Sequence, residues 1–192
     1  MLEQLLNRVS VPAKLLHEPA PRGHELQQIL QAAVSVPDHG ELRPWRFLII
    51  DGDARAQLGD IFVSAAQQLE PDMAAHKLED IRSKPIRSPL IIAVIARLRD
   101  DPKIPQHEQL LSAGLSAYNI LLAANALNYH GIWVTGPLAT HAHTLQALGL
   151  TPTETVVGFI YLGTPSVEDL AKTKVKLKHR PNAADYTEHW TG

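Results

Sequence analysis

Residues 34–51 read V-S-V-P-D-H-G-E-L-R-P-W-R-F-L-I-I-D, and the interpretation of the whole chain depends on this stretch. It leaves a predicted helix, crosses a polar loop framed by two prolines, and enters an apolar run of strand length at Trp45–Ile50. A helix that ends in such a loop and leads into a buried strand commonly presents side chains to a ligand. Ser35 and His39 are the loop residues that we expect to do so.

The bulk composition is that of a globular protein. The chain has 192 residues, of which 45% are hydrophobic and 20% are charged, and this predicts one domain of mixed type spanning residues 1–192. A formal net charge of -2 provides no basic field for nucleic acid. Cysteine is absent, which excludes disulfides, thiolate nucleophiles and thiolate metal sites.

Neither a secretory signal nor a membrane span is visible. The first eight residues lack the apolar core and cleavage site of a signal peptide. No apolar run reaches the roughly 18 residues that a membrane helix needs. We therefore expect a soluble cytoplasmic protein without nucleic-acid or membrane partners.

Apolar periodicity predicts helices alternating with a small number of strands. The expected helices are a short one carrying Leu2, Leu5 and Leu6, one from Gly23 to before Pro37, and those at Ala54–Leu69, Gln106–Asn128 and Thr140–Leu148. The expected strands are Trp45–Ile50, Pro89–Ala96, Gly131–Thr135 and Thr155–Leu162. This order indicates an α+β or α/β layered domain.

Three segments have a distinctive composition. The helix at Gln106–Asn128 is apolar or small nearly all round, which is typical of a core or a subunit interface. Glu70–Ser88 is polar and charged, and we interpret it as a mobile surface helix and loop that would serve as a lid. The tail from Ser166 onward is basic and shows no core pattern, so we expect it to wrap over a partner subunit.

The familiar catalytic motifs are missing. No G-x-G-x-x-G follows a strand, and neither a phosphate-binding P-loop, a nucleophile elbow nor an H-E-x-x-H sequence occurs. If the protein is an enzyme, a bound cofactor must supply the chemistry.

Several stretches, in order along nearly the whole chain, resemble the FMN-dependent nitroreductase family, and most closely its short NAD(P)H nitroreductase branch. They are N-R-V-S at 7–10, E-P-A-P at 18–21, V-P-D-H-G-E-L-R-P-W-R-F at 36–47, R-S-P-L-I-I at 87–92, K-I-P-Q-H-E-Q-L-L-S-A-G at 103–114, G-I-W-V-T-G at 131–136 and V-G-F-I-Y-L-G-T-P at 157–165.

The resemblance implies a nitroreductase-like α+β fold, with a small, mainly antiparallel central sheet flanked by helices. It also implies a long central helix at a subunit interface and a C-terminal extension that wraps the partner. The expected protein is a homodimer with two FMN sites at that interface. NADH or NADPH would deliver hydride to flavin N5, and a small-molecule acceptor such as a nitroaromatic or quinone would then take it in ping-pong order.

The resemblance assigns the FMN phosphate to Arg8, Val9 and Ser10, because a phosphate needs Arg together with hydroxyl or amide donors. Val9 departs from the Arg or His that is usual there and offers only its backbone or an apolar contact. Basic residues at Lys14, Lys178 and Arg180 are candidate substitutes.

The flavin ring is assigned to two further groups. Ser35 and His39 would reach the flavin that is bound mainly by the other subunit, and the strand residues Trp133, Val134 and Thr135 would meet the ring. The end of the long helix matches a stretch that the branch associates with the nicotinamide nucleotide, namely Ala123, Ala124, Asn125, Ala126, Leu127 and Asn128.

A second reading comes from a different class of protein: a non-catalytic flavin-binding or flavin-free sensor or adaptor that retains the fold. Val9 favours it, and so does Glu41, which stands where Asn is frequent. An acid near the ring disfavours the anionic reduced flavin unless Arg43 pairs with it.

Overall fold

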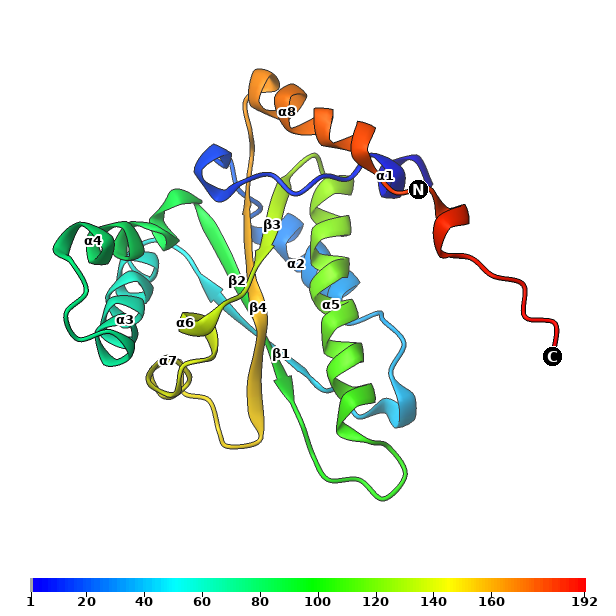
Figure 1. Cartoon of the computed structure of the whole chain (residues 1–192), viewed down its shortest axis with the longest axis horizontal. Helices are drawn as coiled ribbons and strands as arrows, with labels where there is room; N and C mark the ends of the chain where they lie inside the picture. The colour runs from blue at the N-terminus through cyan, green and yellow to red at the C-terminus, as the bar shows by residue number, and fades with distance from the viewer. Residues whose placement is uncertain (1) are drawn as a thin grey trace.

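The computed structural model describes residues 2–192, without the side chains of Lys178 and His179. Its strands are β1 (Trp45–Ile50), β2 (Leu90–Arg97), β3 (His130–Val134) and β4 (Glu154–Gly163) (Figure 1). Its helices are α1 (Leu2–Asn7), α2 (Gly23–Ala33), α3 (Ala54–Leu69), α4 (Ala75–Ser83), α5 (Gln106–Ala126), α6 (Pro137–Thr140), α7 (Ala142–Ala147) and α8 (Val167–Lys174). Short 3-10 turns lie at Ala13–Leu15, His39–Glu41, Pro85–Arg87, Val175–His179 and Ala183–Tyr186.

The four strands form one sheet in the order β1-β2-β4-β3, and every neighbouring pair is antiparallel. The predicted α+β fold with a small antiparallel sheet is therefore confirmed. The apolar run at Leu90–Arg97 occupies a central position between β1 and β4. Its side chains alternate between two cores: Ile91 and Ile95 face one, and Ile92 and Val94 face the other.

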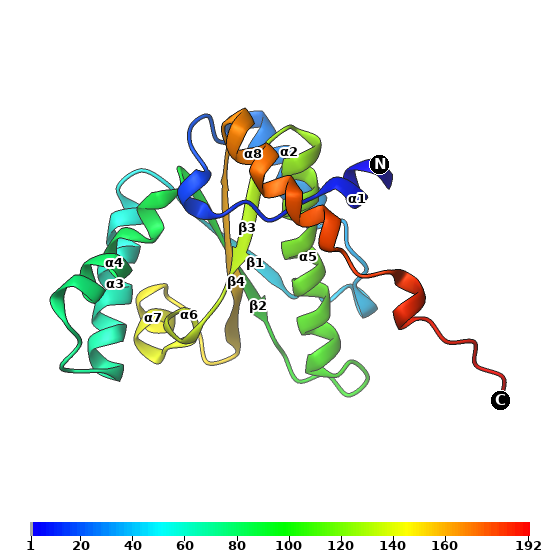
Figure 2. The same cartoon turned by 45° about the horizontal axis from the view of Figure 1, so that its top comes forward.

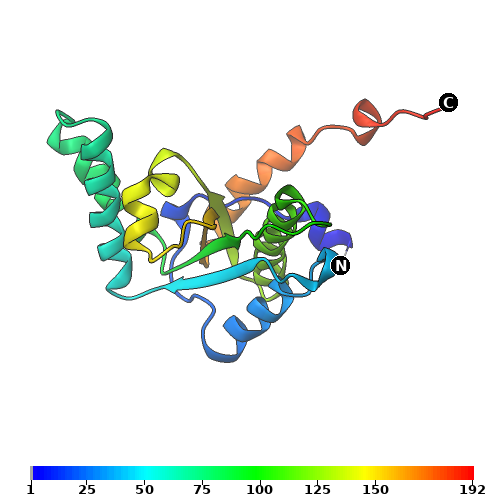
Figure 3. The same cartoon turned by 90° about the horizontal axis from the view of Figure 1, so that it is seen from below.

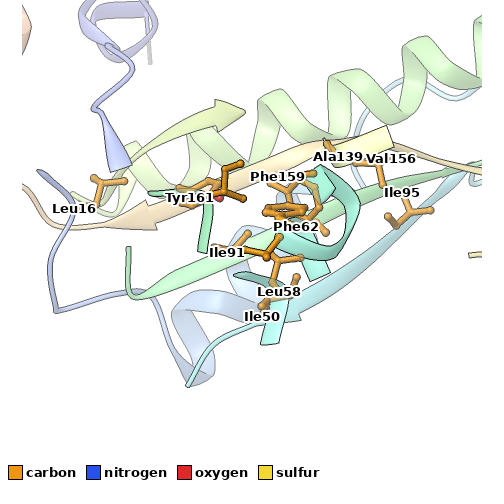
Figure 4. Close-up of a cluster of buried hydrophobic side chains, with 14 of the residues drawn as sticks. Leu16, Ile50, Leu58, Phe62, Ile91, Ile95, Ala139, Val156, Phe159 and Tyr161 are labelled. Atoms are coloured by element: carbon orange, nitrogen blue, oxygen red, sulfur yellow. The ribbon is translucent and has the colours of Figure 1, made fainter. Parts of the chain in front are cut away.

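Helices cover both faces of the sheet (Figure 3). On one face α2 and α5 pack together, and Ile120 and Ala124 of α5 are fully buried against Ile92 and Ile160. On the other face α3, α6 and α7 surround a second core, which includes Phe62 (Figure 4). The ring of Phe62 meets that of Phe159 edge to face, with centroids 5.5 Å apart.

The edge strand β3 is covered on its outer side by the N-terminal segment (Figure 2). Ser10 pairs with Gly131 in a parallel bridge, and the Val11 amide donates to the Gly131 carbonyl at 3.1 Å. This pairing blunts an exposed sheet edge. It also brings two motifs from opposite parts of the sequence side by side.

Two predicted elements differ from the structure. The helix expected at Thr140–Leu148 corresponds to α7, which begins only after His141, because His141 is extended and its ring accepts the His143 amide at 3.3 Å. The preceding helix α6 was not predicted. The basic tail does contain a packed helix, α8, so the statement that it has no core pattern was wrong. Ser166 caps α8, and Leu170 packs against the core. Eight residues are too few for helical periodicity to stand out.

The segment between α3 and β2, which we interpreted from the sequence as a surface helix and loop, packs against the body of the protein. Its helix α4 packs against α3, and Ile81 is buried. After Arg180, which contacts the Arg8 carbonyl, the chain projects away from the body, and Tyr186 and Trp190 are exposed (Figure 1). Among residues 2–192, no helix combines the length and apolar character needed to cross a membrane.

Candidate functional site

The predicted phosphate-binding segment lies between α1 and the edge of β3. Arg8 is partly exposed, its Nη1 lies 3.5 Å from the Ser10 hydroxyl, and its guanidinium stands 5.8 Å from the ring centroid of Tyr118 on α5. The Arg180 guanidinium donates to the Arg8 carbonyl. Val9 is 8% exposed and belongs to the core, so its side chain is turned away from solvent.

Further basic groups surround this segment. Arg8 and His130 line a narrow crevice between the N-terminal segment, β3 and α5, and His130 Nδ1 is buried without a hydrogen-bond partner in the described part of the chain. Burial, followed by the positive charge of Lys174, lowers the pKa of His130. Of the proposed substitutes, Arg180 reaches the segment, whereas the Lys178 side chain lies outside the described residues.

A cavity of about 320 Å³ opens where β3 ends. Its floor consists of aromatic core residues, among them Phe159 and Tyr161, and burial raises the pKa of Tyr161 to about 12. Val134 and Thr135 line one wall, followed by Gly136 at a φ of 146°. A volume of this size with a mostly apolar lining and a few polar groups suits a small organic ligand.

The lining of this cavity also includes two cations. Lys84 and Arg87 line the cavity from the connection between α4 and β2. Arg87 donates to the Asp80 carboxylate at 2.5 Å and to the Ser83 hydroxyl at 3.0 Å, and Lys84 lies 3.6 Å from the same carboxylate. The Arg87 hydrogen bond is the main cause that lowers the pKa of Asp80.

Trp133 differs from its two neighbours, because its indole lies on the α5 face of the sheet rather than in the cavity. The indole N–H donates to the Val157 carbonyl at 3.2 Å. The ring rests on Gly158, where any side chain would overlap it, beside a bulge in the pairing of β2 with β4. The partly buried Trp133 side chain therefore packs at the edge of the core on the α5 face.

The loop after α2 holds Ser35 and His39 in different roles. The Ser35 hydroxyl donates to the carbonyls of Gln31 and Ala32, which caps the end of α2. His39 Nδ1 lies 2.8 Å from Glu108 Oε2 in the first turn of α5. Both side chains are exposed.

Hydrogen bonds between side chains and the backbone fix the shape of this loop. The Arg43 amide donates to Asp38 Oδ2 at 2.6 Å, and Arg99 donates to the Leu42 carbonyl. Glu41 and Arg43 both have positive φ, an uncommon conformation for residues other than glycine. Their side chains form an exposed ion pair at 3.9 Å.

Within one chain His39 lies far from the phosphate segment, whereas Ser35 lies nearer to it, because the Ala32 carbonyl that accepts from Ser35 also accepts from Asn119. His39 contacts Glu108, whereas Arg8 contacts Tyr118, and ten residues of helix separate these anchors by about 15 Å. Most of the residues assigned to the nicotinamide nucleotide take part in helix packing. Ala124 is fully buried, Ala123 and Leu127 pack around it, and Asn128 ends the helix at a φ of 64°.

The outward side of α5 is apolar and uncovered. Leu111 is 65% exposed, and Leu110, Leu115 and Tyr118 are also exposed. With Trp133 and part of β4 they line an open groove of about 590 Å³. Apolar patches of this kind usually mark an interaction surface.

Comparison with known proteins identifies the family. The sequence model described as "Nitroreductase family" matches residues 5–164, which is most of the chain. The chain belongs to the nitroreductase family. This match contains the Ser10 and Gly131 segments that pair at the sheet edge, and it confirms the family inferred from the ordered motifs.

Relatives of the same family align over most of their length. An Escherichia coli protein named "Putative NAD(P)H nitroreductase YdjA" is 38% identical over 167 residues, covering 87% of this chain and 89% of the relative. A Haemophilus influenzae protein named "Putative NAD(P)H nitroreductase" is 32% identical, covering 79% and 82%.

Solved structures of nitroreductase-like proteins share the fold. One from Bacillus cereus superposes with a TM-score of 0.80 at 21% identity, covering 100% of this chain and 96% of the other. A Desulfovibrio desulfuricans protein solved in complex with FMN has a TM-score of 0.69 at 22% identity, with the same coverage. As a member of an oxidoreductase family the chain is an enzyme.

The interpretation of this nitroreductase from sequence missed Lys84, Arg87 and Tyr161. Arg87 opens the R-S-P-L-I-I motif, but its side chain was not singled out, and the surrounding charged segment was interpreted only as a lid. In the part of the chain that the structure describes, no cluster of three or more His, Cys, Asp or Glu residues could hold a metal ion.

Proposed function

We propose that this nitroreductase uses FMN to pass electrons from NADH or NADPH to a small acceptor such as a nitroaromatic or a quinone. The observation that carries the proposal is the backbone pairing of Ser10 with Gly131. It sets a motif suited to a phosphate beside the strand whose far end opens into the cavity. One extended ligand with an anionic end and a flat apolar end suits this arrangement.

The phosphate end would be held by Arg8 and Ser10, with Arg180 and His130 close by. A phosphate monoester carries nearly two negative charges at neutral pH and favours charge-assisted hydrogen bonds. The partly exposed Arg8 guanidinium supplies donors, and the Ser10 hydroxyl lies beside it. Val9 would contribute its backbone only, since its side chain lies in the core.

The ring end would occupy the cavity beside Val134 and Thr135. When bound, FMN supplies the two-electron chemistry, and the protein contributes binding, orientation and exclusion of water. Phe62 and Phe159, which line the cavity, contribute to its apolar lining. The backbone at Gly136 carries no side chain that would hinder close approach. No protein nucleophile is needed, in agreement with the missing catalytic motifs.

A homodimer would complete the site. The exposed apolar side of α5 supports it, as does the distance of about 15 Å between the contacts of His39 and of Arg8 along α5. In a two-fold assembly, the loop of one subunit would approach the phosphate segment of the other. Ser35 and His39 would then reach the partner's flavin, and the projecting C-terminal segment would cover the partner.

The absorption spectrum of the purified protein tests this function. We expect a yellow protein with the visible bands of oxidised flavin, which bleach on anaerobic addition of NADH or NADPH and return with a quinone. Protein that stays colourless and does not bind added FMN would refute the proposal. FMN that binds but resists both reductants would instead favour a non-catalytic flavin-binding sensor or adaptor.

A further inference from the structure

The pair formed by His39 and Glu108 contributes little to the fold. The two side chains are 63% and 39% exposed, and an ion pair this exposed adds little to stability. The contact is nevertheless short, with His39 Nδ1 2.8 Å from Glu108 Oε2, and it joins residues that lie 69 positions apart in the sequence. A short contact with little effect on stability can still fix the orientation of a ring.

The backbone on both sides of this pair is held by other contacts. Arg99 donates to the Leu42 carbonyl, and the buried Gln109 side chain donates to the carbonyls of Arg99 and Ile104 at 2.9 and 3.1 Å. Gly40 lies so close to Ile104 that a side chain at this position would overlap the Ile104 Cδ1 atom. These contacts fix the loop relative to the start of α5 without the ion pair. The carboxylate is therefore left with only the imidazole ring to orient.

The contact also determines which nitrogen of His39 carries the proton. An ionised carboxylate can only accept hydrogen bonds, so Nδ1 of His39 must donate to Glu108. In a neutral imidazole the other nitrogen then carries no proton and acts as an acceptor. Because the His39 side chain is exposed, its Nε2 is offered to a ligand as a hydrogen-bond acceptor.

Ser35 of the same loop has the same polarity. Its hydroxyl has a single proton, and the carbonyls of Gln31 and Ala32 accept it at 3.1 and 2.9 Å. Only the lone pairs of the Ser35 oxygen remain for a ligand. Two acceptors on one loop suit a ligand that presents N–H or O–H donors. FMN carries such donors at N3 of its ring and along its ribityl chain.

We infer that Glu108 is a positioning residue for His39. It holds the imidazole with Nδ1 as the donor, so that Nε2 accepts a hydrogen bond from an N–H or O–H group of the FMN bound mainly by the partner subunit. The inference rests on the FMN site and the homodimer proposed above. Glu108 itself does not touch the cofactor, and its effect on FMN passes through the ring of His39.

An ordinary surface role for Glu108 predicts a different behaviour. Glu108 lies in the first turn of α5, where an acidic side chain is favourable by itself. In that case, removing the carboxylate would change FMN affinity by the same factor whether or not His39 is present. If Glu108 acts through His39, its removal has no further effect once the imidazole is gone.

The experiment is a double-mutant cycle on the whole chain, with Glu108→Ala, His39→Ala and the double variant. The dissociation constant of FMN is measured by flavin fluorescence. Glu108→Ala should weaken binding about three- to tenfold, which is the range for one hydrogen bond. His39→Ala should weaken binding at least as much, and the double variant should bind no more weakly than His39→Ala. Glu108→Gln should keep nearly full affinity, because its amide oxygen still accepts from Nδ1.

The control is a second exposed ion pair with the same geometry. Arg22 pairs with Glu18 at 2.8 Å, and the two side chains are 58% and 59% exposed. Arg22 also lies 3.5 Å from Asp51, which follows the far end of β1 from the loop. Arg22→Ala should therefore leave FMN affinity unchanged.

Nitrogen-15 NMR of histidine-labelled protein provides a readout that does not depend on activity. At mildly alkaline pH, where imidazole rings are usually neutral, the ring nitrogen shifts distinguish the two tautomers. The signals of His39 are those missing from His39→Ala. They should show the proton on Nδ1 in wild type and in Glu108→Gln, and mainly on Nε2 in Glu108→Ala.

Each outcome decides between the two proposals. Wild-type protein that does not bind FMN refutes the proposed function itself. If FMN binds but the two single losses add in the double variant, Glu108 does not act through His39, and the proposed function still stands. A wild-type proton on Nε2, or an unchanged affinity in Glu108→Ala, has the same consequence.

An FMN analogue methylated at N3 identifies the donor, because it lacks the ring N–H. If Glu108→Ala no longer weakens binding of this analogue, His39 accepts from N3. If the loss persists, His39 accepts from a ribityl hydroxyl. Either result retains the acceptor role of Nε2, whereas an analogue that binds Glu108→Ala more tightly than wild type would contradict it.

Discussion

The two faces of the sheet are built from alternate residues of the same strands, yet the long helix α5 covers the centre of one face and a cavity opens on the other. On the covered face a 21-residue helix places small residues such as Ala117 and Ala124 against the strands. On the open face α6 and α7 have only four and six residues. The cavity lies between α6 and the segment that contains the Pro85–Arg87 turn. The cavity therefore lies beside the short helices, whereas the gap on the α5 face is an open groove along the outer side of that helix.

The largest expected effect is a loss of stability, and it tests that contrast by shortening one apolar side chain on each face. Ile120→Ala removes a fully buried side chain from the covered face, and it should destabilise the protein by about 2–5 kcal/mol, because the surrounding residues cannot collapse into the space. Leu138→Ala, at the wall of the cavity, should cost less than half as much, since Leu138 already adjoins open space. Urea unfolding measures both losses. Equal losses would mean that the two faces are packed alike.

A smaller loss of stability is expected when a side chain is added at Gly131, where β3 meets α5. A methyl group at Gly131 would lie 2.7 Å from Leu162 Cδ2 and 3.1 Å from Leu121 Cδ2, and it would overlap the Tyr161 carbonyl. Gly131→Ala should therefore cost about 1–3 kcal/mol through overpacking.

Gly114→Ala is the control for that variant. The nearest atom to the new methyl group is Trp133 Cη2 at 4.0 Å, so the substitution is sterically harmless. It should stabilise α5 by up to about 1 kcal/mol, because alanine has the higher helix propensity. Thermal unfolding of the two variants should shift in opposite directions. A shift in the same direction would contradict the tight fit assigned to Gly131.

Much of the covered face could be predicted from sequence, because its signals are local. The apolar run at Leu90–Arg97 and the helix at Gln106–Ala126 are long and strongly patterned, so their type and approximate bounds follow from periodicity alone. The tail helix α8 was missed because it has eight residues and only a few apolar ones. Its packing through Leu170 is a tertiary effect.

The site was only partly predictable, for a different physical reason. The ordered motifs pointed to Arg8, Ser10, Val134 and Thr135, and the first two lie beside β3 while the last two line the cavity. Local pattern does not say on which face of the sheet a strand residue points, and the structure places the Trp133 indole on the α5 face while Val134 and Thr135 line the cavity. Arg87 lines the same cavity as Phe62 and Val134, which are distant from it in the sequence, and no spacing in the sequence encodes that proximity.

A cluster of ionised side chains at the start of β4 predicts how the stability of the fold depends on pH. Arg46 donates to both oxygens of Glu154 at 2.9 Å, Arg97 lies 3.4 Å away, and the Thr151 amide donates at 3.0 Å. The Arg46 hydrogen bonds are the main cause that holds the pKa of Glu154 below its usual range. The folded state therefore binds this proton less readily than the unfolded chain does.

Glu154→Gln should accordingly cost about 1–2 kcal/mol at neutral pH. The contribution of the carboxylate is fully present above its unfolded pKa of about 4.3 and is lost as the pH falls through its lower folded pKa. Urea unfolding across that acidic range should show the difference from wild type shrinking. A difference that stayed constant on acidification would show that the cluster acts through packing alone. Because this cluster is not part of the cavity lining, Glu154→Gln should leave FMN affinity unchanged.

The smallest expected effect concerns the exposed pair of His39 and Glu108. Side-chain exposures of 63% and 39% place it in water, so Glu108→Ala should cost less than about 1 kcal/mol, and the loss should shrink further in about 1 M salt. The loop keeps its shape because Asp38 accepts the Arg43 amide and Arg99 donates to the Leu42 carbonyl. Asp38→Ala should therefore destabilise more than Glu108→Ala in the same thermal unfolding assay. The reverse order would mean that the loop is held by its exposed ion pair, and a loop held so weakly would be a poor scaffold for presenting His39 to a ligand.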